Sequence, residues 1–189
     1  MPIGFFSNSL NKNAVRIEGS KVLLTGSLAF NFGVALPINL SVNDYTIFQE
    51  NASNNQILGS VSGTINQTVQ NYPLAIDYTL KSTSIETLAT YSSNGRVYTD
   101  VKKVKTVLNA RITSTITVSG IPFPVVLSIL DPQDVVTSYQ YYSKTIGMVY
   151  TNTVINYRLN SLPNGITLPL PSSGNQTQEE FLQTYDVSH

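Results

Sequence analysis

The feature that most constrains this chain is a run of large apolar residues at every second position from Leu28 to Val42. The residues between them are small or polar, apart from Pro37. Successive side chains of a strand point to opposite faces, whereas at helical spacing this set would spread around the axis. Because proline cannot donate to a central ladder, the run predicts one long curved strand or two strands around Pro37. Its apolar face comprises Leu28, Phe30, Phe32, Val34, Leu36, Ile38, Leu40 and Val42.

The two-residue period continues through most of the chain, for example from Leu74 to Leu80. Asn94-Gly95 predicts a tight hairpin, since both residues tolerate the positive φ of a type I′ turn. Strands and helices do not alternate as they do in parallel sheets. We therefore predict an all-β fold of about nine or ten mostly antiparallel strands, arranged as a strongly curved sheet or half-barrel.

Two local signals interrupt the strands. Asp131-Pro132-Gln133-Asp134 predicts a turn. Thr177-Gln178-Glu179-Glu180 has capping-box spacing, which is compatible with a short C-terminal helix or with a frayed end. We predict an N-terminal tail (1–14), a single β-domain (15–160) and a loop with a C-terminal tail (161–189).

Composition indicates an exported protein. Only 12% of residues are charged, against about 25% in typical domains, whereas Asn, Gln, Ser and Thr together make 68 of the 189 residues. Such neutral polar surfaces are common in exported bacterial β-proteins. The segment after Met1 has no basic and apolar signal-peptide pattern. The expectation is therefore an extracytoplasmic protein, in the periplasm or outer membrane of a Gram-negative bacterium, with its export signal upstream of Met1.

The sequence offers few residues for catalysis or metal binding. It has no cysteine, and its one histidine is the terminal His189. Cysteine nucleophiles, Ser-His-Asp triads and the common zinc sites therefore lack members. We expect no catalytic, cofactor or metal site and no enzyme activity. A hydrolase using dispersed carboxylates is the least favoured alternative, with Asp131 and Asp134 close in sequence, and Glu179 and Glu180 on the tail.

Two further groups of residues bear on binding. The densest basic stretch is Lys102, Lys103 and Lys105, in which strand spacing places only the last two on one face. With a net charge of zero, no nucleic-acid partner is expected. The tyrosines at 139, 141 and 142 favour ordinary sheet packing, or alternatively an aromatic platform for sugars or bases.

The segments Asn94–Val104 and Tyr141–Val149 resemble strand-turn-strand segments of exported lipoproteins of Bacteroidetes-type bacteria, many of unassigned function. Some of those proteins are similar to the carrier and receptor of the lipoprotein-localisation system, an open half-barrel with a hydrophobic concave face. Thr145 departs from the pattern, since it replaces a small, glycine-like position. The resemblance implies membrane attachment only through a lipid anchor on a cysteine absent from this chain. It assigns no functional residues.

Three functions follow as hypotheses. The first is non-catalytic binding of a lipid or other apolar or amphipathic ligand in a concave sheet, lined by Leu28, Phe30, Phe32, Val34, Leu36 and Ile38. The alternative is a structural or adhesive β-sandwich that binds through its polar, tyrosine-rich surface. The third is the hydrolase. A roomy apolar cavity would favour the first, a solid core with an exposed tyrosine patch the second, and two facing acids in a cleft the third.

Overall fold

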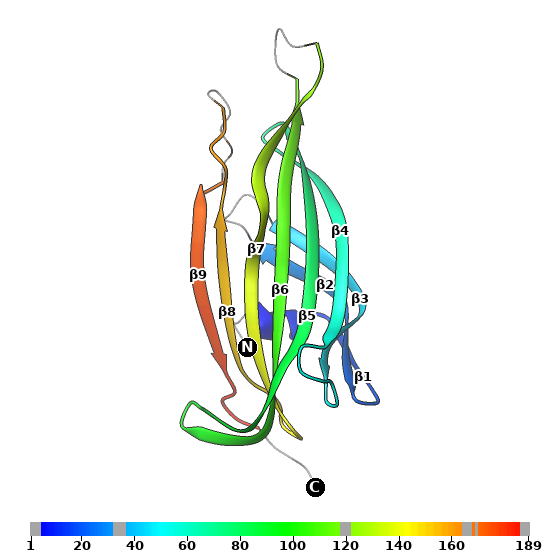
Figure 1. Ribbon diagram of the computed structural model, residues 1–189, viewed down its shortest axis with the longest axis vertical. Coiled ribbons are helices and arrows are strands. Elements are labelled where there is room, and N and C mark those ends of the chain that lie inside the picture. The colour runs from blue at the N-terminus through cyan, green and yellow to red at the C-terminus, as the bar shows by residue number, and fades with distance from the viewer. Residues whose placement is uncertain (1–4, 32–36, 118–121, 164–167, 169, 186–189) are drawn as a thin grey trace.

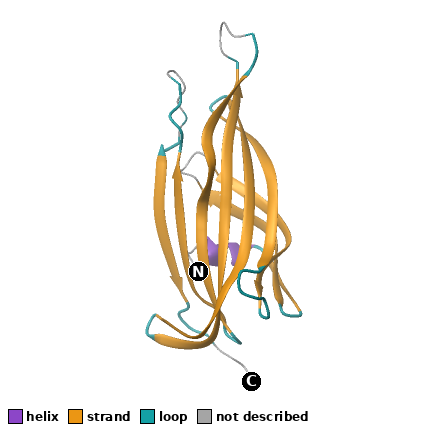
Figure 2. Ribbon diagram, in the orientation of Figure 1, coloured by secondary structure: helices purple, strands orange, loops and turns teal. Residues whose placement is uncertain are grey.

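A computed structural model describes residues 5–31, 37–117, 122–163, 168 and 170–185. Nine strands and one helix occur in these ranges. Figure 1 shows long, gently twisted strands, and Figure 2 shows the helix beside them. The elements are α1 (Phe5–Lys12), β1 (Ala14–Glu18), β2 (Lys21–Asn31), β3 (Pro37–Gln49), β4 (Ile57–Val69), β5 (Tyr72–Ser93), β6 (Arg96–Ile116), β7 (Val125–Ser143), β8 (Gly147–Arg158) and β9 (Ser173–Phe181).

The strands form two antiparallel sheets in which each strand pairs with its neighbours in sequence. One sheet has the order β1-β2-β3 and the other has the order β4-β5-β6-β7-β8-β9. The small sheet runs obliquely across one face of the large sheet (Figure 1). The prediction of an all-β, antiparallel fold with about nine strands is confirmed. The strands divide into two facing layers that do not close into a barrel.

The apolar run of the sequence forms the β2–β3 pair. Leu28 pairs with Leu40 and Phe30 with Ile38, so these four residues share one face. That face is buried, whereas Ala29 is exposed. The run therefore forms two strands, as the second alternative predicts, but the break precedes Pro37, which is the first residue of β3. The predicted positions Phe32, Val34 and Leu36 lie outside the described residues.

The main core lies between the two sheets, and we call the side of each sheet that faces it the inner face. Its contributors alternate along the strands with exposed or half-buried residues, as the two-residue period requires. The most deeply buried large side chains include Leu24, Ile38, Leu40, Leu74, Ile76, Leu80, Leu108, Ile112, Ile129 and Leu130.

The sheets approach most closely where β3 meets β4. A Cβ atom at Gly59 would lie 2.8 Å from the carbonyl oxygen of Thr46, so only glycine allows this contact. The layers are thus joined closely along this side of the molecule.

The Asn94-Gly95 turn is confirmed, and two other local predictions are wrong. Both turn residues have positive φ, 48° and 73°. The segment Ser173–Phe181 is strand β9 instead of a helix, because it hydrogen-bonds along β8, whereas a two-turn helix would be marginal. The Asp131–Asp134 segment lies within β7, where a register shift opposite Ala110 and Ile112 accommodates Pro132 as a bulge. The structure places its helix, α1, in the expected N-terminal tail.

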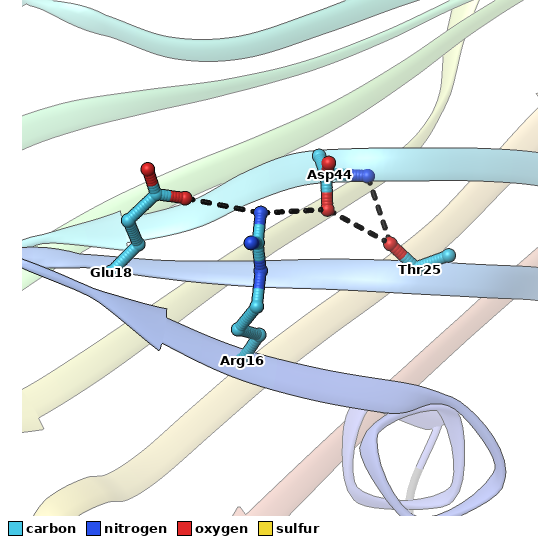
Figure 3. Close-up of polar contacts among 4 residues, drawn as sticks. All are labelled: Arg16, Glu18, Thr25 and Asp44. Carbon is cyan, nitrogen blue, oxygen red and sulfur yellow. Dashed lines mark hydrogen bonds and ion pairs between the residues drawn. The ribbon is translucent and has the colours of Figure 1, made fainter.

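The outer face of the small sheet carries a polar group rather than core residues (Figure 3). The Arg16 guanidinium lies 3.0 Å from Glu18 and 3.2 Å from Asp44. Asp44 has a positive φ of 50°, and its backbone N–H donates to the hydroxyl of Thr25 at 2.9 Å. The three charged side chains are 54–64% exposed. Exposed ion pairs stabilise little. Thr25 and Asp44 lie at the register shift between β2 and β3.

Candidate functional site

The inner face encloses a small apolar cavity where the predicted lipid site would lie. Its volume is about 20 Å³, room for one water-sized sphere. Leu28 and Phe30 line it, whereas Ile38 is buried in the core outside the lining. Sites for drug-sized ligands usually have about 300–1,000 Å³. The space between the sheets is therefore filled mainly by side chains.

Helix α1 closes this cavity from one side. Phe6 and Leu10 line the cavity together with residues of both sheets. The backbone N–H of Phe6 donates to the Glu180 carboxylate of β9 at 2.9 Å. After the helix, the Asn13 side chain accepts from the N–H of Ser27 and donates to its carbonyl, at 2.7 and 2.9 Å. The helix is thus held by the large sheet at its start and by β2 at its end.

Beside the cavity, hydroxyl and amide groups form a buried hydrogen-bonded row across the large sheet. The hydroxyl of Tyr45 on β3 lies 2.9 Å from that of Ser82, which lies 2.9 Å from that of Thr106. Thr106 donates to the Gln140 side-chain oxygen at 3.2 Å. Burial raises the pKa of Tyr45 to about 12, against the smaller opposing effect of its bond to Ser82. This row ties the two layers together.

A neighbouring group of buried polar atoms has no hydrogen-bond partner among the described residues. It includes the Gln140 amide nitrogen and the hydroxyls of Ser84, Tyr142 and Thr151. Burial also raises the pKa of Tyr142, which packs against Phe48. An unsatisfied buried group costs free energy, so this part of the inner face is destabilising.

The three lysines of the basic stretch separate as predicted. Lys102 is on the inner face, where its ammonium donates to the carbonyl of Ala52 at 2.6 Å and burial lowers its pKa. Lys103 and Lys105 are on the opposite, outer face of the large sheet, half-buried. Burial alone would lower the pKa of Lys103, but Glu86, at 3.1 Å, and Tyr141 outweigh it and raise that pKa.

The end of the β5–β6 hairpin bends across the outer face of β7 and β8 (Figure 1). The bend coincides with a register shift between Ser84 and Glu86 and with a positive φ of 50° at Asp100. Beneath the bent end lies a second apolar cluster. Its buried members are Tyr98, Val101 and Val149, and its partly buried members are Leu88, Tyr91, Tyr141, Ile146 and Leu182.

Four rings next to this cluster form what we call the aromatic cluster: Tyr91, Tyr141, Tyr150 and Phe181. Tyr91 stacks on Tyr141 with centroids 4.2 Å apart. Tyr150 lies 5.4 Å from Tyr141 and 5.1 Å from Phe181. Burial, aided by Tyr141, Tyr150 and Glu179, raises the pKa of Tyr91 to about 12. Burial and a short hydrogen bond to Glu179 also raise the pKa of Tyr150.

A groove of about 450 Å³ lies on the outer face of β5, β6 and β7. We call it the outer groove, and its volume falls in the usual range for ligand sites. Asn109 donates to the Asp134 carboxylate at 2.9 Å, which fixes one wall. Lys105 lies at the groove, with its ammonium 5.9 Å from the centroid of Tyr139. The lining residues are Thr79, Lys81, Thr83, Ile85, Lys105, Val107, Asn109 and Asp134.

The outer groove is not among the sites predicted from the sequence. The sequence pattern that could have indicated it is the alternation of Thr79, Lys81 and Thr83 with Leu80 and Ser82. This alternation is typical of a strand with one solvent-exposed face. The structure also contains a groove of about 400 Å³ near the other end of the sheet, with no charged side chain in its lining. Charge therefore distinguishes the outer groove from that second groove.

The carboxylates considered for hydrolysis do not converge as sequence proximity suggested. Glu179 and Glu180 lie on opposite faces of β9, the first bonded to Tyr150 and the second to the N–H of Phe6. Asp131 is exposed and accepts from Ser128 at 2.6 Å, and bonds from Ser128 and Asn160 lower its pKa. Within the described part of the chain, no three His, Cys, Asp or Glu residues are grouped for metal binding.

Comparisons of this chain with protein-family models, with curated proteins and with solved structures found no match. Among the described residues, no helix has the length and apolar character needed to span a bilayer.

Proposed function

We propose that this protein is a non-catalytic binding module of the bacterial cell envelope that holds a hydroxyl-rich ligand, such as a saccharide, in the outer groove. The observation that carries the proposal is the contrast in volume. The outer groove offers about 450 Å³, whereas the cavity between the sheets offers about 20 Å³. A filled core with tyrosines on the outer face is the arrangement that favours surface binding over a lipid cavity.

The lining of the outer groove suits such a ligand. Thr79, Thr83 and Asn109 supply hydroxyl and amide groups that can both donate and accept hydrogen bonds. Ile85 and Val107 add apolar surface for the C–H faces of a sugar ring. The groups lie on strands in the middle of a six-stranded sheet, so the site is preorganised. Export to the envelope is part of the proposal and is supported by the neutral, Asn- and Thr-rich composition.

A panel of soluble oligosaccharides tests this function, with binding followed by amide shifts in NMR spectra. We expect a binding sugar to shift signals from residues 79–85 and 105–109. Thr83→Trp should fill the groove and abolish binding without lowering the melting temperature. Thr177→Trp, on the outer face of β9 and outside the groove, is the matched control and should bind normally. Binding unchanged by Thr83→Trp would refute the groove as the site.

A second function, binding of an apolar ligand between the sheets, is supported by the construction of α1. The helix has eight residues, Phe5–Lys12, of which two are Asn and two are Ser. Isolated helices below about 12–15 residues are marginal, so α1 depends on the packing of Phe6 and Leu10. If α1 leaves, Leu24, Leu28 and Phe30 form an apolar wall for an alkyl chain.

Dodecanoate binding, measured by native mass spectrometry and calorimetry, tests this second function. The double substitution Phe6→Ala with Leu10→Ala should weaken the hold of α1 and raise affinity for the fatty acid. Val15→Ala with Ile17→Ala is the control, because both residues are exposed on β1, 47% and 77%. If neither wild type nor the α1 variant binds dodecanoate, the second function is wrong.

A further inference from the structure

The outer groove contains two ammonium groups without a carboxylate partner. Lys81 and Lys105 form no ion pair with any described residue, whereas Lys103 pairs with Glu86 and Lys144 with Glu50. The one described contact of the Lys105 ammonium is the Tyr139 ring. Lys81 is on β5 and Lys105 is on the neighbouring strand β6. Lys81 pairs with Val107, which is two residues from Lys105. Two adjacent cations are therefore available to a ligand.

The nearby acids do not neutralise these two cations. Asp134 is the one carboxylate in the lining, and Asn109 already donates to one of its oxygens. Glu86 is held by Lys103 at 3.1 Å. Glu179 is bonded to Tyr150, outside the groove. The lining thus has two positive charges and one negative charge, on a chain whose net charge is zero.

We propose that the outer groove binds an acidic saccharide, a sugar chain that carries carboxylates. A carboxylate placed at Lys81 and Lys105 makes charge-assisted hydrogen bonds, which are roughly twice as strong as neutral ones. Sugar hydroxyls donate to the free oxygen of Asp134 and exchange hydrogen bonds with Thr79 and Thr83. Asp134 disfavours a ligand that is densely charged along its length, such as a polyphosphate. This inference rests on the proposed saccharide-binding function and specifies its ligand.

Matched acid and ester pairs test the charge of the ligand separately from sugar binding. The probes are trisaccharides of galacturonate, glucuronate and mannuronate, each as the free acid and as the methyl ester, measured by calorimetry. We expect at least one acid to bind about tenfold or more tighter than its ester, because a hydrogen bond to a charged group contributes more. Higher NaCl should weaken binding of the acid and leave the ester unchanged.

Lysine variants locate the effect. Lys81→Gln and Lys105→Gln should each weaken binding of the acid by about tenfold and leave binding of the ester unchanged. Lys21→Gln, exposed on β2 in the other sheet, is the control and should change neither. Thermal melting of all three variants should match wild type, since these side chains are outside the core.

The outcomes separate the two proposals. Equal binding of acid and ester overturns the acidic ligand and leaves saccharide binding intact. Tripolyphosphate that binds more tightly than every sugar, and is lost in the same two variants, overturns the saccharide as the ligand of these lysines. Absence of binding across the uronates and across the wider neutral panel overturns both the inference and the proposed function.

Discussion

The two faces of the large sheet are formed by the same alternating strands, but the inner face is covered and the outer face keeps an open groove. The inner face is covered by β2, β3 and α1, and the cavity that they enclose with it has about 20 Å³. The outer face keeps a groove of about 450 Å³, and the bent β5–β6 hairpin covers only the region beside it. Polarity alone does not explain this, because the inner face also carries buried hydroxyls, such as Ser82 and Thr106. The elements that cover a face therefore decide whether it keeps an open groove.

The largest expected effect tests whether the inner face is buried away from water. Phe30→Asp places a carboxylate where the side chain is 4% exposed, at a cost of several kcal/mol. Because domains are stable by only about 5–15 kcal/mol, we expect a poorly folded or insoluble protein. Ala29→Asp, one residue away and exposed, should melt within a few degrees of wild type. Similar melting temperatures for Phe30→Asp and wild type would contradict the buried-face assignment.

Alkaline titration compares the inner and outer tyrosines. Tyr45 titrates near pH 10 when unfolded, whereas burial raises its folded pKa to about 12. The unfolded state therefore loses this proton first, and stability present below pH 10 falls by roughly 2–3 kcal/mol as pH rises to 12. The Tyr45→Phe variant does not lose stability in this way, but it also lacks the hydrogen bond to Ser82. We expect the variant to be less stable than wild type at pH 8 and more stable at pH 12, by urea unfolding.

The aromatic cluster offers the outer-face counterpart of that titration. Charges on Tyr141, Tyr150 and Glu179 contribute to the raised pKa of Tyr91, after burial. Salt screens charges at the surface more than those inside the core. In 1 M NaCl, absorbance titration should show a lower pKa for Tyr91 and an unchanged pKa for Tyr45, each assigned by its Phe variant. Equal responses would mean that the bent hairpin shields the aromatic cluster from salt as fully as the core is shielded.

The sequence predicts those parts of the fold that depend on local chemistry. The Leu28–Val42 period gives the buried face of β2 and β3, and Asn94-Gly95 gives the β5–β6 turn. Strand β9 could not be predicted, because Thr177–Glu180 also has capping-box spacing and its pairing with β8 is a long-range contact. The outer groove depends on where the large sheet twists and bends, which no local pattern specifies. Inner-face residues such as Ser84 made the two faces of β5 hard to distinguish.

A smaller effect compares two buried threonines on the inner face. The hydroxyl of Thr151 is fully buried without a described partner, whereas that of Thr153, two residues on, lies 2.7 Å from the hydroxyl of Ser138. Thr151→Val removes an unsatisfied group and should stabilise the protein by about 1 kcal/mol. Thr153→Val leaves Ser138 unpaired and should destabilise by about 1 kcal/mol. Urea unfolding of both variants gives the sign, and destabilisation by Thr151→Val would show that its hydroxyl is satisfied in solution.

The smallest effect concerns the β7–β8 turn. Thr145 has a φ of 68°, which is unusual for a β-branched residue. Glycine adopts this conformation without a steric cost, although it also gains freedom in the unfolded chain. Because strain at such a position costs about 1–3 kcal/mol, Thr145→Gly should be a net stabilisation of about 0.5–1 kcal/mol. Thr145→Val keeps the branched shape without the hydroxyl and should match wild type. A loss of stability in the glycine variant, seen as a lower urea midpoint, would mean that unfolded-state entropy outweighs strain in this turn.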